Sequence, residues 1–302
     1  MHRKLVVAAI VAVAAVSAAA SAFWYLTIPK TTAASTLIPT RTRNIANGRT
    51  MFLIGGCSSC HATPKQKDET RLGGGLALNT SFGVFYVPNI SPDTRDGIGS
   101  WNEAQFVTAM MDGVSPGGKH LYPAFPYTSY RMMQISDLRD LFAYLKTLPA
   151  ISGRVRDHDL RFPFNTRRAL GIWKRLFLDT KAYEPDVTQF AKWQRGRYLV
   201  NGPGHCAECH SPRNFLGAII SSRRFTGGQS LTGQGGVPDI TQGKLHDWKV
   251  EDFAEVLQTG MTPDADRVGG MMVDVVANTR QLSDADREAM AVYLKSLPAP
   301  SR

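Results

Sequence analysis

The arrangement of the cysteines constrains this chain more than any other feature. The 302 residues contain only four cysteines, which stand in two motifs of one pattern, Cys57-Ser58-Ser59-Cys60-His61 and Cys206-Ala207-Glu208-Cys209-His210. Cys-x-x-Cys-His is the attachment signature of c-type haem. Two thiols must reach the vinyl groups at one porphyrin edge, and the next residue must place an imidazole under the iron. The sequence therefore predicts two covalently bound haem c groups, held by Cys57, Cys60, Cys206 and Cys209 and ligated by His61 and His210.

Three other uses of the cysteines explain less of the pattern. Two disulfides would suit an oxidising compartment but would give the following histidines no role. A four-cysteine zinc site would require two distant pairs to meet and would again leave both histidines unexplained. A thioredoxin-like redox motif is expected once, between a strand and a helix. Two matching motifs that use every cysteine favour haem attachment.

The sequence around the motifs is repeated, which bears directly on architecture. Val87-Pro88-Asn89-Ile90-Ser91 matches Val237-Pro238-Asp239-Ile240-Thr241. Further matches at one constant spacing pair Trp101, Phe106, Gly113 and Pro116 with Trp248, Phe253, Gly260 and Pro263. At a spacing two residues longer, Asp137, Tyr144, Leu148 and Pro149 match Asp286, Tyr293, Leu297 and Pro298. Each unit therefore has a short helix before the motif, a Gly/Pro-rich loop and then further helices.

This organisation predicts a mainly α fold with two tandem helical domains. The segments that follow each Trp have apolar residues at helical spacing and end at a Gly. The last helix has Ser283 as its expected N-cap, and strand signals are scarce. We expect an N-terminal segment at 1–28, domains at 40–150 and 191–299, and a connector at 151–190.

The connector contains apolar and basic residues at helical spacing. The simpler interpretation is a linker helix that packs Trp173 and Phe177 between the domains. The alternative is that some of Arg161, Arg167 and Arg168 neutralise haem propionates, since a guanidinium fork suits a carboxylate.

The N-terminal segment indicates export. Leu5 to Leu26 contains no charged residue, and at about 1.5 Å per residue it would span roughly 33 Å, enough to cross a hydrocarbon core of about 30 Å. Cleavage after Ala22 would make it a signal peptide. The length of the run and the aromatic cluster Phe23-Trp24-Tyr25 favour an uncleaved anchor. In both cases Arg3 and Lys4 hold the N-terminus inside, so the remainder lies outside the cytoplasmic membrane.

The second haem has a candidate for its sixth iron ligand. Methionine is the usual partner of histidine when a higher potential is needed. Met272 lies in a loop before the final helix, after two glycines that allow close backbone approach. We expect Met272 to be this ligand, with Met271 as the alternative, although a methionine in such a stretch is more often core filler.

The first haem has no equivalent methionine, because Phe125 stands at the position that corresponds to Met272. Phenylalanine cannot ligate iron. The candidates are, in order, Met133, Met132 and His120, and an open sixth position is the remaining alternative.

Several segments resemble the membrane-anchored multi-haem cytochrome c subunits of bacterial periplasmic dehydrogenases, such as alcohol and gluconate dehydrogenases, and di-haem relatives associated with molybdenum hydroxylases. The resemblance runs from about residue 45 to 298 and rests on 55–62, 87–92, 97–101, 119–127, 204–213 and 269–272. It implies two tandem cytochrome c-type helical domains after an N-terminal apolar helix. In that family a methionine usually stands between the residues matching Ala124 and Pro126, where this chain has Phe125. Its members often carry three haems, whereas this chain has two motifs.

The expected function is electron transfer rather than catalysis. Electrons would enter from a periplasmic dehydrogenase or other donor and leave to a terminal oxidase or soluble cytochrome of the respiratory chain, on the periplasmic side of the bacterial inner membrane. The alternative is a di-haem oxidoreductase that acts on peroxide or a sulfur compound at a first haem without a firm sixth ligand. The net charge of +10 favours anionic surfaces, but no compact Lys/Arg run indicates nucleic-acid binding.

Overall fold

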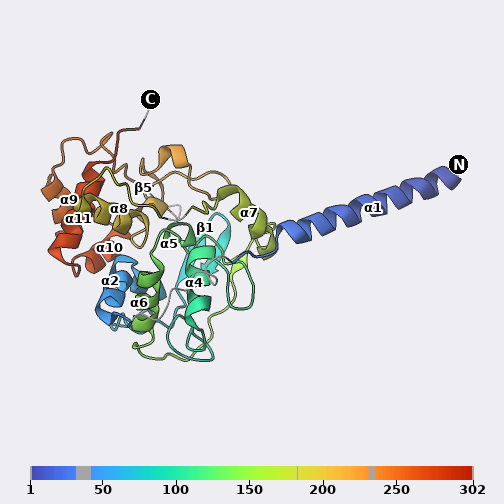
Figure 1. Cartoon of the computed structure of the whole chain (residues 1–302), viewed down its shortest axis with the longest axis horizontal. Coiled ribbons are helices and arrows are strands. Elements are labelled where there is room, and N and C mark those ends of the chain that lie inside the picture. Colours follow the sequence, from blue (N-terminus) through green and yellow to red (C-terminus); the bar gives the residue numbers. More distant parts are fainter. Residues whose placement is uncertain (1, 32–41, 182, 231–234, 301–302) are drawn as a thin grey trace.

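The computed structural model describes residues 2–31, 42–181, 183–230 and 235–300. Over these residues the chain is mostly helical, as predicted, with short strands in two small antiparallel sheets (Figure 1). The elements follow in the order α1 (His2–Leu26), α2 (Ile45–Ile54), α3 (Cys57–His61), β1 (Ala77–Thr80), β2 (Gly83–Tyr86), α4 (Glu103–Asp112), α5 (Tyr127–Tyr130), α6 (Ile135–Leu145), β3 (Asp159–Leu160), η2 (Arg167–Ala169), α7 (Leu170–Phe177), α8 (Ala191–Asn201), η3 (Cys206–Glu208), η4 (Ser221–Arg223), β4 (Gly228–Gln229), β5 (Gly236–Val237), α9 (Val250–Thr259), α10 (Met272–Thr279) and α11 (Asp284–Lys295).

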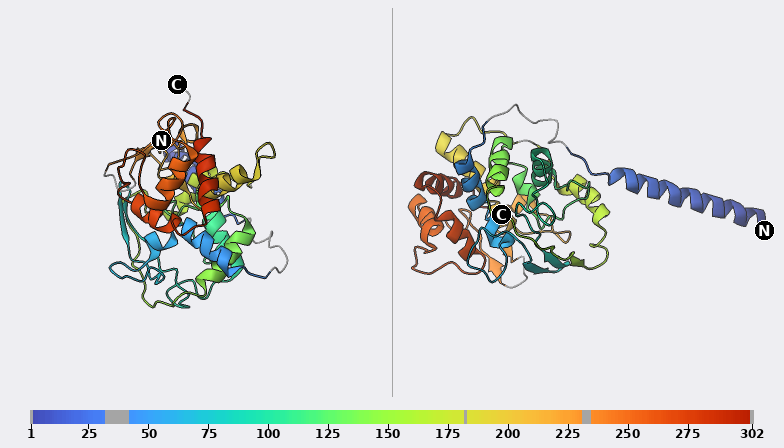
Figure 2. Two further views of the ribbon diagram at one scale, coloured as in Figure 1. Left: turned by 90° about the vertical axis from the view of Figure 1, so that its left-hand side faces the viewer. Right: turned by 90° about the horizontal axis from the view of Figure 1, so that it is seen from below.

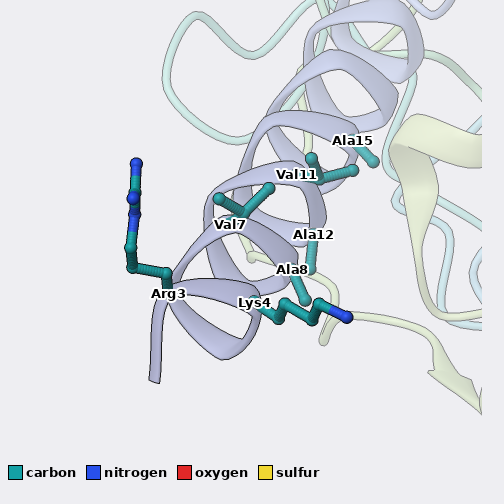
Figure 3. Close-up of a pocket in the computed structure, with 7 residues that line it drawn as sticks. All are labelled: Arg3, Lys4, Val7, Ala8, Val11, Ala12 and Ala15. Carbon is teal, nitrogen blue, oxygen red and sulfur yellow. The ribbon is translucent and has the colours of Figure 1, made fainter. Parts of the chain in front are cut away.

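Helix α1 projects away from the rest of the chain as a single straight rod (Figures 1 and 2). None of its residues is buried, and its mean hydropathy of 2.4 over a membrane-length window makes it long and apolar enough to cross a bilayer. Figure 3 shows one side of its first turns, where two basic residues precede small apolar ones: Arg3, Lys4, Val7, Ala8, Val11, Ala12 and Ala15. The predicted N-terminal apolar helix is therefore present.

The same pair of helices forms twice in the body of the molecule. Helix α2 packs on α6, and α8 packs on α11. Each crossing has a glycine at its closest point. A Cβ atom at Gly48 would lie 2.1 Å from the carbonyl oxygen of Asp140, and one at Gly196 would lie 1.8 Å from that of Ala289. These glycines are needed because the backbones touch, and they occupy equivalent places in the repeat.

Local sequence signals set the ends of the other helices. Asn102 and Gln105 form a capping box at the start of α4, which ends at Gly113 in the left-handed conformation (φ 59°). Gly260 (φ 78°) ends α9 in the same way. Ser283 accepts a hydrogen bond from the amide of Asp286, so it is the N-cap of α11, as predicted.

The two helical units share one hydrophobic core. A single buried cluster includes Met51 and Leu141 of the first unit together with Leu199 and Met290 of the second. The division at 40–150 and 191–299 thus describes the repeat in sequence, whereas the packing is continuous across it. The connector adds β3 to the edge of β2 and then forms α7, which lies beside the base of α1 (Figure 1).

Candidate functional site

The first Cys-x-x-Cys-His motif forms the short helix α3. Gly56 precedes it in the left-handed conformation (φ 55°), which turns the chain sharply from α2 into the motif. Residues three apart in a helix lie on the same side, so Cys57 and Cys60 share one face. The imidazole of His61 follows at the end of the turn.

The second motif repeats this geometry. His205 precedes η3 in the left-handed conformation (φ 39°), at the position equivalent to Gly56. Cys206 begins the turn, and the main-chain amide of His210 donates a hydrogen bond to the carbonyl of Cys206. Both motifs therefore fold as a single tight turn after a short helix.

A proline carbonyl orients each histidine. Nδ1 of His61 lies 2.8 Å from the carbonyl oxygen of Pro88, and Nδ1 of His210 lies 2.8 Å from that of Pro238. A proton on Nδ1 donated to this oxygen leaves the Nε2 lone pair free for a metal. This contact gives the repeated Val-Pro segments a role that the sequence reasoning missed.

The environment also keeps both imidazoles neutral. Burial lowers the pKa of His61 to about 4, against the opposing effect of the hydrogen bond to Pro88. Burial likewise lowers the pKa of His210. A neutral imidazole is the form that ligates iron.

Glycines bring the proline loops close to the motifs. The amides of Gly74 and Gly227 donate to the carbonyls of His61 and His210, each at 2.9 Å. Both glycines have positive φ (69° and 77°), and a Cβ atom on either would collide with the backbone of the proline segment. Each His-Pro contact thus depends on a glycine that no other residue can replace without strain.

The cysteine chemistry fits covalent haem. All four thiols are free in the structure, and burial raises the pKa of Cys57 and Cys206 to about 12. Among the described residues, no group of three or more His, Cys, Asp or Glu side chains is arranged to hold a metal ion. A four-cysteine zinc centre is therefore not formed by these residues, whereas each motif has two thiols and an oriented imidazole.

The candidate sixth ligand of the second haem lies at the start of α10. Met272 is its first residue and is partly buried against the core. Met271 is 43% exposed. Nothing stands within 4 Å of an added Cβ at Gly269 or Gly270, so this loop has open space beside it. Ligation by Met272 stays a prediction.

The first candidate for the sixth ligand of the first haem, Met133, is more deeply buried than Met272. Met133 is 3% exposed in the core, and its amide donates to Tyr130 just as the amide of Leu282 donates to Thr279 in the second unit. Met133 thus has the place that an ordinary core leucine has in the repeat. Its ligand role stays a prediction.

The other two candidate ligands of the first haem are His120, which contacts the base of α1, and Met132, which is partly buried. Nε2 of His120 lies 2.9 Å from the carbonyl oxygen of Thr27, at the base of α1. Met132 is partly buried. Phe125 packs against the rings of Tyr127 and Tyr130, with centroids 6.4 and 5.5 Å away.

Each haem motif is contacted by the opposite unit, through equivalent positions. Nδ2 of Asn278 donates to the hydroxyl of Ser59, in the first motif, at 3.0 Å. The hydroxyl of Ser129 donates to Glu208, in the second motif, at 2.8 Å. Ser59 corresponds to Glu208, and Ser129 to Asn278, at one constant spacing in the sequence. The units therefore face each other across an approximate two-fold relation.

Glu208 is the most strongly engaged residue of this interface. Its carboxylate accepts hydrogen bonds from Thr128 (2.6 Å) and Ser129 and pairs with Arg213 at 2.7 Å. Burial raises the pKa of Glu208, but Arg213 and the hydroxyl donors outweigh it, so the pKa is lowered overall. A buried, ionised carboxylate thus joins the second motif to α5 of the first unit.

The two motifs meet around Tyr130. Its hydroxyl donates to the carbonyl of Gly55 at 3.3 Å, and its ring lies against His205 with centroids 5.4 Å apart. Burial raises the pKa of Cys60, and the nearby Cys209 raises it further. The two attachment turns are therefore neighbours, which the sequence reasoning did not predict.

The connector packs between the units, as predicted. The ring of Trp173 lies 6.5 Å from that of Tyr127, and its Nε1 donates to the carbonyl of Leu216 at 2.9 Å. Arg167 donates to the carbonyl of His120, and Arg168 to residues at the base of α1. These bonds give Arg167 and Arg168 a role in holding the chain around α1, and the propionate role stays a prediction.

The fold and the two motifs define the class of protein, a c-type cytochrome with two sites for covalent haem. The family model described as Cytochrome c matches residues 45–149. The chain is 49% identical over 260 residues to a protein of Cereibacter sphaeroides named diheme cytochrome c-type, a match that covers 85% of this chain and 87% of that one. The chain belongs to the di-haem c-type cytochromes, which bind two copies of haem c.

The chain is also similar to parts of larger dehydrogenase subunits. It is 38% identical over 254 residues to a nicotinate dehydrogenase subunit of Pseudomonas putida, and 36% over 262 residues to the fructose dehydrogenase cytochrome subunit of Gluconobacter japonicus. These matches cover 84% and 85% of this chain but only 21% and 53% of those proteins. They confirm the family resemblance found in the sequence.

Proposed function

We propose that this protein is an electron carrier that takes electrons from a periplasmic dehydrogenase or another donor and passes them toward the respiratory chain. The terminal acceptor is an oxidase or a soluble cytochrome. The observation that carries the proposal is the meeting of the two attachment turns around Tyr130 and His205. The names of the relatives, which include cytochrome subunits of dehydrogenases, support the same role.

The residues of the chain have distinct tasks in this function. Cys57 and Cys60 hold one haem, and Cys206 and Cys209 the other. The haems supply one-electron oxidation and reduction when bound. The Pro88 and Pro238 carbonyls fix the tautomer of His61 and His210. We assign Met272 to the sixth position of the second site and retain Met133 as the first candidate at the other.

The units are proposed to act as one rigid body. Reciprocal contacts at Ser59 and Glu208 fix the two motifs relative to each other. A shared core limits relative motion of the two partly buried turns. Electron transfer requires little reorganisation in such surroundings, so the arrangement suits a carrier. We retain 40–150 and 191–299 as the two domains.

Helix α1 is proposed to be an uncleaved anchor in the inner membrane, with the body on the periplasmic side. Its length, its mean hydropathy of 2.4 and the aromatic residues at its end support this location. N-terminal sequencing of the mature protein tests it, because a first residue of Phe23 would show cleavage.

Haem content and ligand binding test the function. Protein matured in a periplasm should contain two haems per chain by pyridine haemochrome, and the double variant Cys206→Ala/Cys209→Ala should contain one. A carrier should bind carbon monoxide slowly or not at all at both reduced haems. Rapid binding at one haem, together with turnover of peroxide or thiosulfate, would replace the carrier with the di-haem enzyme, which the relatives do not favour.

A further inference from the structure

The base of α1 is fixed to the connector by several contacts. Thr27 is completely buried, and its hydroxyl accepts a hydrogen bond from Nε of Arg168 at 3.0 Å. Arg168 also donates to the carbonyl of Trp24 at 2.9 Å, and its guanidinium lies 3.8 Å from the centroid of the Trp24 ring. Together with the His120 contact to Thr27, these bonds join α1 to the body without a free hinge.

Helix α7 touches the same turn of α1. A Cβ atom at Gly171 would lie 2.6 Å from Cα of Thr27, so the two backbones are in contact there. Nε of Arg175 donates to the carbonyl of Leu26 at 2.6 Å. Figure 1 shows α7 beside the end of α1 where that helix enters the body.

Helix α7 has an inner and an outer face. Gly171 and Trp173 are buried, the first against Thr27 and the second against Tyr127 and the Leu216 carbonyl. Ile172, Arg175 and Leu176 are exposed, and their spacing places them on one outer side of the helix. Ile172 and Leu176 are 38% and 64% exposed. An apolar and basic stripe therefore faces solvent next to α1.

More exposed apolar surface surrounds this stripe. Tyr25 and Leu26, in the last turn of α1, are 71% and 42% exposed, and Ile28 is 44% exposed. Phe215 is 85% exposed and precedes Leu216, whose carbonyl is bonded to Trp173 of α7. These side chains are further exposed apolar groups at the end of α1 and in the part of the second unit that contacts α7.

We propose that the outer face of α7, formed by Ile172, Arg175 and Leu176, lies in the headgroup region of the bilayer that α1 enters. At about 1.5 Å per residue the 25 residues of α1 are longer than a hydrocarbon core of about 30 Å. The aromatic end of α1 therefore lies at the membrane interface. A helix hydrogen-bonded to that turn lies at the same depth.

The apolar and basic side chains of this stripe suit the headgroup region of a bilayer. An amphipathic helix with basic and apolar residues lies in the interface plane, with its apolar side chains among the acyl-chain ends. The exposed guanidinium of Arg175 suits anionic headgroups. The inference rests on the proposed membrane anchor and is independent of the haem chemistry. It means that the body lies against the membrane with one defined side.

Photo-crosslinking of the full-length holoprotein tests this inference. A benzophenone amino acid replaces Leu176 in one variant, Val187 in a second and Val13 in a third. Val187 is the matched control, since it is apolar and 93% exposed but lies before α8. Each variant is placed in vesicles of phosphatidylethanolamine and phosphatidylglycerol and illuminated, and lipid adducts are measured by mass spectrometry. The Soret spectrum checks that both haems are retained.

We expect a lipid-adduct yield at 176 that is at least tenfold above that at 187 and comparable with that at 13. Equal yields at 176 and 187, with lipid adducts at 13, would overturn the docking while leaving the anchor intact. A cross-link from 176 to a second copy of the chain in place of lipid would also overturn it. Absence of lipid adducts at 13 would overturn the anchor and the docking together, with no bearing on electron transfer.

Discussion

Replacement of Gly196 by alanine tests the helix crossing on which the second haem site is built. The added Cβ would lie 1.8 Å from the carbonyl oxygen of Ala289 and 2.6 Å from its carbonyl carbon. Helices α8 and α11 must then move apart by roughly 1.6 Å to restore an ordinary contact distance of about 3.4 Å. Overpacking costs about 1–3 kcal/mol, and more where the backbone must move. Alanine recovers about 1 kcal/mol of helix propensity.

The net loss expected for Gly196→Ala is about 2 kcal/mol of unfolding free energy. In a protein of this size that loss lowers Tm by roughly 4–8 °C. Thermal unfolding followed by the Soret band and by far-ultraviolet circular dichroism measures it. Gly48→Ala should behave similarly, because its Cβ would lie 2.1 Å from the Asp140 carbonyl oxygen.

Gly117→Ala is the matched control. It has no heavy atom within 4 Å of the added Cβ and no positive φ, so its unfolding free energy should change by less than about 0.5 kcal/mol. If Gly196→Ala unfolded at the same temperature as Gly117→Ala, with two haems retained, the proposed close crossing of α8 and α11 would be refuted.

Three further predictions concern the haem sites. Glu208→Gln should cost about 2 kcal/mol at neutral pH, since it removes a buried charge from Arg213 but keeps an acceptor. Because the pKa of Glu208 is lowered below 4.5, its stabilisation is present above that pH and is lost as the pH falls through the lowered pKa. The Tm difference between Glu208→Gln and wild type should therefore shrink on acidification, and a constant difference would contradict this. Met272→Ala should abolish the methionine-to-iron charge-transfer band of one ferric haem and lower its potential, whereas Met271→Ala should leave both unchanged; the reverse result would reassign the ligand. With Met133 as the ligand of the first haem, Phe125→Met should leave the share of methionine-ligated haem in magnetic circular dichroism unchanged, and a rise in that share would show that the first haem lacks a methionine ligand and that position 125 reaches the iron.

The haem-binding turns could be predicted because their chemistry is local. Two thiols and an imidazole at fixed spacing are enough to define attachment, and a single turn of helix presents them. The N-cap at Ser283 and the helix ends at Gly113 and Gly260 follow from neighbouring residues in the same way. The mainly helical class is therefore predicted correctly, but the segment with Met272, which we expected in a loop, begins helix α10 (Met272–Thr279).

The partners of the histidines are less accessible from the sequence. The Val-Pro segments are visible as a repeat, but their role depends on main-chain carbonyls at Pro88 and Pro238. A carbonyl oxygen is common to every residue, so residue identity does not point to it. The positive φ at Gly74 and Gly227 is the related signal, since glycines at equivalent places in both units indicate a backbone constraint.

The connector shows the opposite case, where the sequence marks the residues but not their partners. Trp173 is expected between the units and lies there. Arg168 is a candidate for a haem propionate by charge, and that role stays a prediction. Its guanidinium donates to the Trp24 carbonyl and the Thr27 hydroxyl. These partners are far from it in the sequence, and the contact depends on where α1 joins the body.

The interface between the units follows from the repeat once their orientation is known. When two similar units pair about an approximate two-fold axis, every contact between one position and another occurs twice. Position 59 with 278 and position 208 with 129 are such a pair. In one copy the motif residue is the neutral Ser59, and in the other it is the ionised Glu208, balanced by Arg213. The repeat therefore gives both haem motifs the same geometry, while a single residue gives them different electrostatic surroundings.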